Sequence, residues 1–245
     1  MKHEGHAPPG TLYLIPTPLG DTPLDRVLPE ETRRITARLS HFVVEHAKTA
    51  RAFLKQVGTE TPLQQLNLTE LNEHTPANAI DGLLAPLLAG MDVGLLSEAG
   101  CPAIADPGAN LVRRAHERGI PVRPLVGPSS ILLALMGSGL TAQRFAFHGY
   151  LPAKPHERIQ ALHQLERRAE REDAAQAFIE TPYRNRALFE SILAACHPDT
   201  WLSLSCDLTL STERVNIRRI ADWNGHCPEL DRHPCVFLLW RAPRK

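Results

Sequence analysis

Short apolar runs alternate with amphipathic segments along the first half of this chain, and this alternation limits the possible folds more than any other feature. The runs at residues 11–15, 42–44 and 93–96 have the length of buried strands. Segments at residues 47–57 and 76–88 have the start and stop signals of helices. Strands that alternate with helices form a parallel sheet with crossover helices. The first half is therefore predicted to fold as one α/β domain.

The pattern changes in the second half. Apolar strands at residues 145–147 and 177–179 flank a long charged helix that ends near Glu172. Three later strands follow one another without helices, and such neighbours are usually antiparallel. We therefore predict a second α/β domain with a mixed sheet. The three later strands are expected at residues 201–205, 215–220 and 236–240.

Glycine and proline residues around Gly127 separate these two patterns. We predict a flexible tail over residues 1–10, an N-terminal α/β domain over residues 11–127 and a C-terminal α/β domain over residues 128–245. A chain of 245 residues is long enough for each domain to bury its own core.

The composition is that of a folded protein without a dominant charge. Apolar residues make up 43% and charged residues 22%, which argues against disorder. The 27 basic residues balance 27 acidic ones, so any surface that attracts nucleic acid must be local. No apolar run approaches the roughly 20 residues of a membrane span, and the first residues do not resemble a signal peptide. The five cysteines are odd in number and lack Cys-x-x-Cys spacing, which favours reduced thiols. We therefore expect a cytoplasmic protein that does not associate with a membrane.

Three loops are expected to leave the carboxyl ends of strands, where ligands bind in open α/β sheets. They cover residues 16–20, 97–108 and 127–130, and they are rich in glycine, proline and small residues. The second is longer than the roughly 2 to 6 residues usual for such connections, and long ordered loops are commonly functional. The alternative is a structural turn before a helix, with Asp106 as its N-cap. Glu98 is better placed to meet a ligand, because it is among the first residues after a buried strand.

These loops belong to an ordered series of motifs. The series is Ile15-Pro16-Thr17-Pro18-Leu19-Gly20, Ser97 to Gly108, Val126-Gly127-Pro128-Ser129-Ser130, Ser138-Gly139-Leu140 and Phe147-His148-Gly149-Tyr150-Leu151-Pro152-Ala153-Lys154. From about Thr11 to Arg186, the series resembles the tetrapyrrole methylase superfamily, and within it most closely the ribosomal RNA small-subunit methyltransferase I family. The occurrence of several motifs in one order makes this resemblance specific.

The resemblance implies two α/β domains of tetrapyrrole methylase type, paired as a homodimer, with S-adenosylmethionine folded into the cleft between the domains. It implies methylation of a ribose 2′-hydroxyl on a cytidine of small-subunit ribosomal RNA, so RNA or the small ribosomal subunit is the expected partner. In this family the cofactor is held mostly by backbone groups. The matching positions here are Pro16, Pro18, Glu98, Cys101, Ser129, Ser130, Glu180 and Thr181.

Three motifs differ from the family pattern. Glu98-Ala99-Gly100-Cys101 replaces Asp-Ala-Gly-Thr, and Glu45-His46-Ala47-Lys48-Thr49-Ala50-Arg51 replaces a segment with Glu-Asp-Thr-Arg. Cys206-Asp207-Leu208-Thr209-Leu210 replaces Arg-Glu-Leu-Thr-Lys, which removes an arginine and a lysine that could contact phosphate or substrate. Two other functions therefore stay open: methyl transfer to a tetrapyrrole or another small molecule, and a non-catalytic binding protein on the same fold.

Methyl transfer from a sulfonium is an in-line displacement, in which the protein mainly aligns the acceptor and excludes water. A ribose hydroxyl is a poor nucleophile, so a nearby base or cation assists the reaction. For each candidate for this role, a solvated surface charge without a catalytic function is an equally good interpretation. The candidates are Glu45, Lys48, Arg51 and Lys154, and His74 is a candidate for substrate contact.

This chemistry requires no metal, and no metal site is predicted, because four histidines and cysteines near the C-terminus lack the spacing of a known zinc finger. The charged helix has two interpretations. Its arginines could form a basic edge for RNA, but the interleaved glutamates favour a solvent face with salt bridges. The possible zinc ligands are His226, Cys227, His233 and Cys235, and the arginines are Arg158, Arg167, Arg168 and Arg171.

Overall fold

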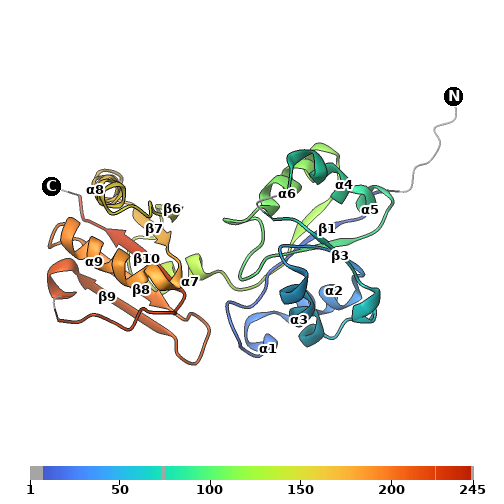
Figure 1. Cartoon of the computed structure of the whole chain (residues 1–245), viewed down its shortest axis with the longest axis horizontal. Coiled ribbons are helices and arrows are strands. Elements are labelled where there is room, and N and C mark those ends of the chain that lie inside the picture. The colour runs from blue at the N-terminus through green and yellow to red at the C-terminus, as the bar shows by residue number, and fades with distance from the viewer. Residues whose placement is uncertain (1–7, 73–74, 224, 244–245) are drawn as a thin grey trace. The chain divides into compact units, whose positions relative to one another are not determined.

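The computed structural model describes residues 8–72, 75–223 and 225–243 (Figure 1). The chain divides after Pro128 into two α/β units. The first unit contains a five-stranded sheet in the order β3-β2-β4-β1-β5, and every strand pair in it is parallel. Its strands are β1 (Leu12–Ile15), β2 (His41–Val44), β3 (Asn67–Glu70), β4 (Val93–Leu96) and β5 (Val122–Pro124).

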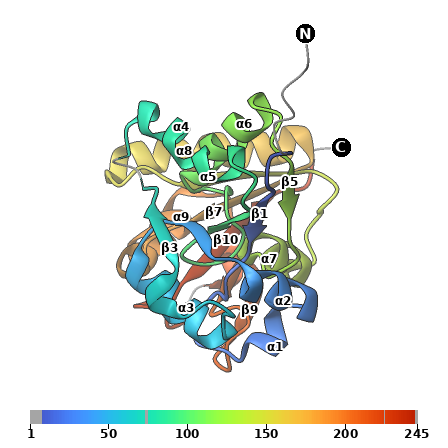
Figure 2. The same cartoon turned by 90° about the vertical axis from the view of Figure 1, so that its right-hand side faces the viewer.

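Helices cover both faces of the first sheet (Figure 1, Figure 2). Side chains alternate along a strand, so Tyr13 and Ile15 face α1, α2 and α3, whereas Leu12 faces α4, α5 and α6. The central strands β1, β2 and β4 are buried on both faces and are near-continuous apolar runs, which is why the sequence predicts them. The helices are α1 (Leu24–Val27), α2 (Glu30–Arg38), α3 (Ala47–Val57), α4 (Ile80–Leu83), α5 (Ala85–Leu88) and α6 (Gly108–Glu117).

The prediction of one continuous helix over residues 76–88 is wrong. The segment forms the 3-10 turn η2 (Ala77–Ala79), followed by the two short helices α4 and α5. Pro86 has no N–H to donate to the preceding turn, so the helical hydrogen bonds are interrupted there. The apolar side of the segment still packs into the core through Ile80 and Leu87.

The second unit contains a mixed sheet in the order β6-β7-β10-β8-β9. The pair β6 and β7 is parallel, whereas β10 is antiparallel to both β7 and β8, and β8 is antiparallel to β9. This arrangement confirms the predicted mixed sheet. The elements are α7 (Ser130–Ser138), β6 (Phe145–Tyr150), α8 (Pro155–Glu172), β7 (Ala175–Ile179), α9 (Asn185–Ala195), β8 (Trp201–Cys206), β9 (Arg214–Arg219) and β10 (Cys235–Trp240), with 3-10 turns at Pro182–Arg184 and Ile220–Trp223. The first unit has a further 3-10 turn at Leu63–Gln65.

Helices α8 and α9 pack on one face of this second sheet and bury its aromatic core. The rings of Phe178 and Phe237 stack with their centroids 5.8 Å apart, and both side chains are fully buried. Helix α8 spans 18 residues, but it is strongly charged. Within the part of the chain that the structure describes, no helix is both long and apolar enough to cross a membrane.

The ladder between β8 and β10 places Cys206 opposite Cys235, and these two cysteines form a disulfide. The expectation of reduced thiols is therefore wrong for this pair. Their 29-residue separation carries no signal, because strand register brings them together. Cys101, Cys196 and Cys227 are free. Burial raises the pKa of the Cys196 thiol to about 12.

Candidate active site

The three predicted ligand loops leave the same edge of the first sheet. Every strand of this sheet is parallel, so all of its carboxyl ends lie at one edge. Strand β1 lies between β4 and β5, which makes the loops that follow these three strands direct neighbours. This edge is the place where ligands bind in open α/β sheets.

Hydrogen bonds join the three loops to one another. Thr17 and Gly100 exchange backbone hydrogen bonds of 2.9 and 3.0 Å, which connects the loop after β1 to the loop after β4. The Cys101 thiol donates to the main-chain oxygen of Pro128 over 3.4 Å, which connects the loop after β4 to the loop after β5. Thr17 is thus part of the site although sequence reasoning did not select it. The shape of this edge is set mainly by the backbone.

A glycine makes the close approach of the first and third loops possible. A Cβ atom on Gly127 would lie 2.4 Å from the Pro16 Cβ, which is closer than any real contact of this kind. Gly100 has a φ of +77°, in the left-handed region that favours glycine. Pro16 and Gly127 therefore lie in direct contact, and a larger residue at position 127 would separate the loops.

Asp106 holds the long loop after β4 in place. Its carboxylate accepts hydrogen bonds from the backbone N–H groups of Ala103, at 2.9 Å, and Gly108, at 2.7 Å. Gly108 is the first residue of α6, so Asp106 satisfies a free N–H of that helix, although Pro107 occupies the N-cap position itself. Burial raises the pKa of Asp106, and the two backbone bonds oppose this shift. Ala103 and the neighbouring Ala105 have positive φ angles, so this loop is locally strained.

Glu98 connects this edge to the start of helix α3. Its Oε1 accepts a hydrogen bond of 2.6 Å from the Thr49 hydroxyl, and the same oxygen lies 3.3 Å from Nδ1 of His46. The sequence motif pointed to this segment but not to these two side chains. Lys48 and Arg51 are exposed on α3, and Glu45 is half-buried just before it.

Comparison with known proteins identifies the family. No family model matches the chain. It is 32% identical to the ribosomal RNA small subunit methyltransferase I of Escherichia coli O157:H7 over 219 residues, which cover 84% of this chain and 68% of the relative. The protein of the same name from Pseudomonas aeruginosa is 30% identical over 239 residues, covering 96% and 80%. This chain belongs to the ribosomal RNA small subunit methyltransferase I family.

Solved structures agree with this assignment at the level of fold. The methyltransferase CobJ has a TM-score of 0.63 at 19% identity and covers 96% of this chain and 95% of its own. The cobalt precorrin-4 methyltransferase CbiF has a TM-score of 0.58 at 14% identity, with 94% of each chain covered. The predicted tetrapyrrole methylase fold is therefore confirmed. The chain is a methyltransferase, and S-adenosylmethionine is the methyl donor that its motifs imply.

Several predicted residues of this methyltransferase lie in the second unit. Ser129 is the N-cap of α7, where its hydroxyl oxygen accepts a hydrogen bond from the Leu132 N–H over 3.4 Å. Lys154 is the N-cap of α8, and its exposed ammonium lies 3.1 Å from Glu157. His74 lies outside the described residues.

Glu180 lies at the carboxyl end of β7, and its side chain is fully buried. Its Oε1 accepts hydrogen bonds of 2.7 Å from both the Thr181 N–H and Nη2 of Arg184. Among the described residues, its Oε2 is buried without a hydrogen-bond partner. One oxygen of Glu180 therefore stabilises the turn after β7, and the other keeps unused capacity to accept a hydrogen bond.

The possible zinc ligands of the second unit have other partners. Cys235 is in the disulfide, and Nδ1 of His233 lies 2.7 Å from Oδ2 of the buried Asp207. Cys227 is exposed and accepts a hydrogen bond from Arg186. No group of three or more potential metal ligands occurs among the residues that the structure describes.

Proposed function

We propose that this chain transfers a methyl group from S-adenosylmethionine to the ribose 2′-hydroxyl of a cytidine in small-subunit ribosomal RNA. The observation that carries the proposal is the edge of three joined loops after β4, β1 and β5, in a member of this family. The tetrapyrrole alternative has less support, because the tetrapyrrole enzymes are similar only in fold, at 19% identity or below for the two compared.

The chemistry of this edge fits the proposed cofactor. The adenosine part is flat and partly apolar, and Ile104 and Val126 expose 52% and 72% of their surface on the loops after β4 and β5. The Glu98 carboxylate complements a positively charged sulfonium or ammonium group. The cleft between the domains stays a prediction. The residues proposed to hold the cofactor are Pro16, Pro18, Glu98, Cys101, Ser129, Ser130, Glu180 and Thr181.

When bound, the cofactor supplies an electrophilic methyl group, and the chain must align the acceptor and remove its proton. We assign the proton acceptor to His46. Its contact with Glu98 favours a proton on Nδ1, which leaves Nε2 available to accept the hydroxyl proton. The Thr49 hydroxyl holds the Glu98 carboxylate in place, and this carboxylate in turn orients the His46 imidazole through Nδ1. The catalytic candidates from the sequence keep supporting roles. Lys48, Arg51 and Lys154 are proposed as cations that contact phosphate or the developing alkoxide, and Glu45 is proposed as a second carboxylate.

We further propose that the methyltransferase works as a homodimer, and that it acts in the cytoplasm because its proposed substrate is ribosomal RNA, rather than because its thiols are all reduced. Leu132 and Met136 expose 54% and 78% of their surface, and they lie four residues apart on α7. Two large apolar side chains at this spacing share one helix face and favour burial against a partner. Sedimentation equilibrium should give twice the 27.2 kDa chain mass, and Met136→Lys should shift it toward the monomer.

The test measures cofactor binding and methyl transfer separately. Calorimetry should show that the wild type and His46→Gln bind S-adenosylmethionine equally well. With purified small subunits and labelled cofactor, His46→Gln should lower kcat by about 100-fold or more, because general base catalysis contributes at least this much. His116→Gln, an exposed histidine on α6, is the matched control and should behave as wild type.

The position of the label decides between acceptors. A methyl group on a ribose 2′-oxygen blocks alkaline cleavage of the adjacent RNA linkage, so the labelled site should survive alkaline hydrolysis as a dinucleotide. Label on a base or on a tetrapyrrole would refute the proposed acceptor. No binding at millimolar cofactor would refute the proposal as a whole.

A further inference from the structure

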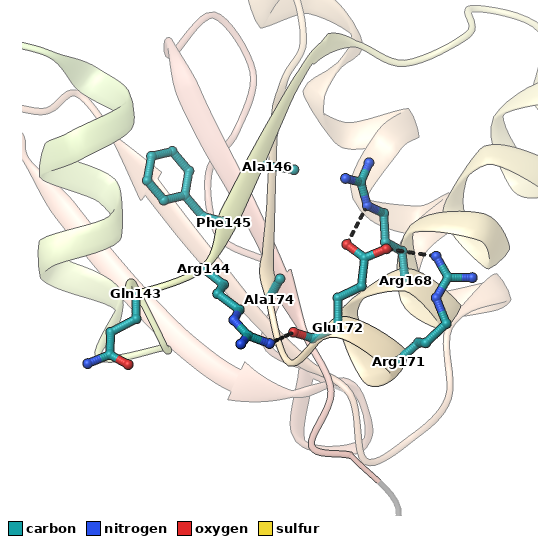
Figure 3. A pocket seen from close by; sticks show the side chains of 8 residues that line it. All are labelled: Gln143, Arg144, Phe145, Ala146, Arg168, Arg171, Glu172 and Ala174. Carbon is teal, nitrogen blue, oxygen red and sulfur yellow. Dashed lines mark hydrogen bonds and ion pairs between the residues drawn. The ribbon is translucent and has the colours of Figure 1, made fainter.

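A cavity of about 580 Å³ opens at the amino ends of the parallel strands β6 and β7 (Figure 3). It lies at the opposite end of these strands from Glu180 and Thr181, so it is not part of the proposed cofactor site. Its volume is within the range of about 300 to 1,000 Å³ for small-ligand sites. The lining residues are Gln143, Arg144, Phe145, Ala146, Arg168, Arg171, Glu172 and Ala174.

The lining of this cavity carries a net positive charge. Three of its side chains are arginines, and Glu172 is its one acid. Hydrogen bonds from Arg168 and Arg171 lower the pKa of the Glu172 carboxyl, so this group is ionised at neutral pH. Three guanidinium groups and one carboxylate leave a charge of about +2 at the cavity.

The arginines are held in place but keep free donors. Arg168 uses Nε and Arg171 uses Nη2 to bind the Glu172 carboxylate, at 2.8 and 2.7 Å. Arg144 donates from Nη1 to the Glu172 main-chain oxygen over 3.2 Å. Figure 3 shows these bonds converging on Glu172. Each guanidinium has five N–H donors, so most of them remain for a ligand that is rich in acceptor oxygens.

An exposed aromatic ring follows Arg144 in the chain and lies across β6 from Arg168 and Arg171 (Figure 3). Phe145 exposes 44% of its surface, and its ring lies on the side of Arg144 away from Glu172 (Figure 3). Proteins that bind single-stranded nucleic acid combine cations, which contact the phosphates, with aromatic rings, on which bases stack. A free phosphate ion would use the arginines but not the ring. The combination of both features therefore favours a nucleotide chain as the ligand.

We propose that this arginine pocket binds the phosphate backbone of single-stranded ribosomal RNA, with a base stacked on Phe145, and docks the substrate of the methyltransferase. The proposal rests on the proposed function, since it names a second contact for the same RNA. Bidentate arginine–phosphate bonds supply both energy and geometry here. The contact reads no sequence, so it adds affinity and orientation rather than choice of nucleotide.

The test compares two double variants of equal charge. Arg144→Gln with Arg171→Gln removes two pocket cations and leaves Arg168 in place to hold Glu172. Arg34→Gln with Arg113→Gln removes two exposed arginines of the first unit, which pair with Glu31 and Glu117. The probe is a fluorescein-labelled single-stranded oligoribonucleotide of about 16 nucleotides, measured by fluorescence anisotropy over a range of salt concentrations.

The pocket variant should bind this RNA at least about tenfold more weakly, because hydrogen bonds to charged groups are strong. Its dependence of log Kd on log salt should be flatter by about 1.4, since each lost phosphate contact removes about 0.7. Phe145→Ala should weaken binding without changing the salt dependence. The first-unit variant should match the wild type. Calorimetry of S-adenosylmethionine should give wild-type affinity for all variants, which shows that they are folded.

Three results would overturn the pocket proposal. The first is wild-type affinity and salt dependence in the pocket variant. The second is an equal loss in the first-unit variant, which would show a general charge effect. The third is a cytidine monophosphate affinity equal to that of the oligonucleotide, which would identify a mononucleotide site. Methyl transfer to small subunits is measured independently, so pocket-dependent RNA binding without transfer would refute the proposed function alone.

Discussion

The sheet edge where β1, β4 and β5 end in the first unit and the edge where β7 and β8 end in the second unit are held together by different forces. In the first unit, backbone hydrogen bonds between Thr17 and Gly100 and the contact of Gly127 with Pro16 fix the loops. In the second unit, two buried carboxylates do this work: Oε1 of Glu180 accepts a hydrogen bond from Arg184, and Oδ2 of Asp207 lies 2.7 Å from Nδ1 of His233. An edge defined by its backbone keeps its shape when side chains change, whereas an edge defined by charges depends on the ionisation of each group.

The disulfide makes the largest difference between the two edges, because it adds a covalent bond to the edge of the second unit. Asp207 follows Cys206, and His233 precedes Cys235 by two residues, so the bond constrains the charged cluster directly. Replacing both cysteines with serine should destabilise the second unit by about 3–4 kcal/mol, the value expected for closing a loop of this length. Urea unfolding followed by tryptophan fluorescence measures this unit specifically, because Trp201, Trp223 and Trp240 all belong to it.

Cys227→Ser is the matched control, since Cys227 is a free, exposed cysteine of the same unit. It should leave the fluorescence transition unchanged. A wild-type transition that does not move when a reducing agent is added would contradict the stabilising role of the disulfide.

Gly127→Ala tests the packing of the first edge. The added Cβ would meet the Pro16 ring at 2.4 Å, and a proline ring cannot move without its backbone. Overpacking of this kind costs about 1–3 kcal/mol, and the displaced loops should also lose most of their affinity for S-adenosylmethionine. Calorimetry measures the cofactor affinity, and urea unfolding followed by far-UV circular dichroism measures the stability. The unfolding transition of the second unit, followed by tryptophan fluorescence, should not change.

Gly82→Ala provides the comparison for this change. Gly82 lies in helix α4, and no atom lies within 4 Å of a Cβ placed there. Alanine should be neutral or slightly stabilising at this position, because it favours the helix. Wild-type cofactor affinity in Gly127→Ala would show that the approach of the loops after β1 and β5 does not shape the site.

Asp106 is the exception at the first edge, because it is a partly buried carboxylate that holds backbone. Its raised pKa means that the folded state binds a proton more tightly than the unfolded state does. Ionisation of Asp106 therefore costs stability as pH rises from its ordinary value of 3.8 through the raised pKa, and this cost disappears at lower pH. Asp106→Asn keeps an oxygen for the N–H groups of Ala103 and Gly108 but removes the charge.

The asparagine variant should lose this pH dependence and be at least as stable as the wild type at neutral pH. Asp106→Ala loses both hydrogen bonds and should be destabilised by about 1–2 kcal/mol, as for the loss of a helix cap. Urea unfolding at several pH values, followed by circular dichroism, measures both effects. Asp25→Asn, at an exposed aspartate of the same unit, should keep the wild-type profile. A wild-type pH profile in Asp106→Asn would contradict the assigned cause.

The sequence predicted what is local in the chain. The central strands β1, β2 and β4 of the first sheet are buried on both faces, so their apolar runs are visible, and the three ligand loops follow from their glycines and prolines. Strand β3 carries little signal, because three of its four residues are exposed. The helix breaks before Pro86, because proline has no N–H to donate, although the apolar periodicity continues through this position.

What the sequence did not predict depends on distant pairings. The contact of His46 with Glu98 spans two loops, and the disulfide depends on the register between β8 and β10. Arg158 was grouped with the surface arginines of α8, but it is buried and donates from Nε to the Ser191 hydroxyl over 3.0 Å. Its position four residues before the buried Leu162 places it on the core side of the helix. That spacing is readable in the sequence, whereas the partner on α9 is not.

The smallest expected effect is at Cys101, where the family has threonine. The thiol donates to the Pro128 oxygen, and a threonine hydroxyl can make the same bond. If the first edge is defined by its backbone, Cys101→Thr should change stability by less than about 0.5 kcal/mol and cofactor affinity by less than about threefold. Cys101→Val, which fills similar space without a donor, should lose more because the Pro128 oxygen loses its partner. Calorimetry on both variants measures the difference. A large effect of threonine would mean that the identity of this side chain, rather than the backbone, determines how the first edge holds its ligand.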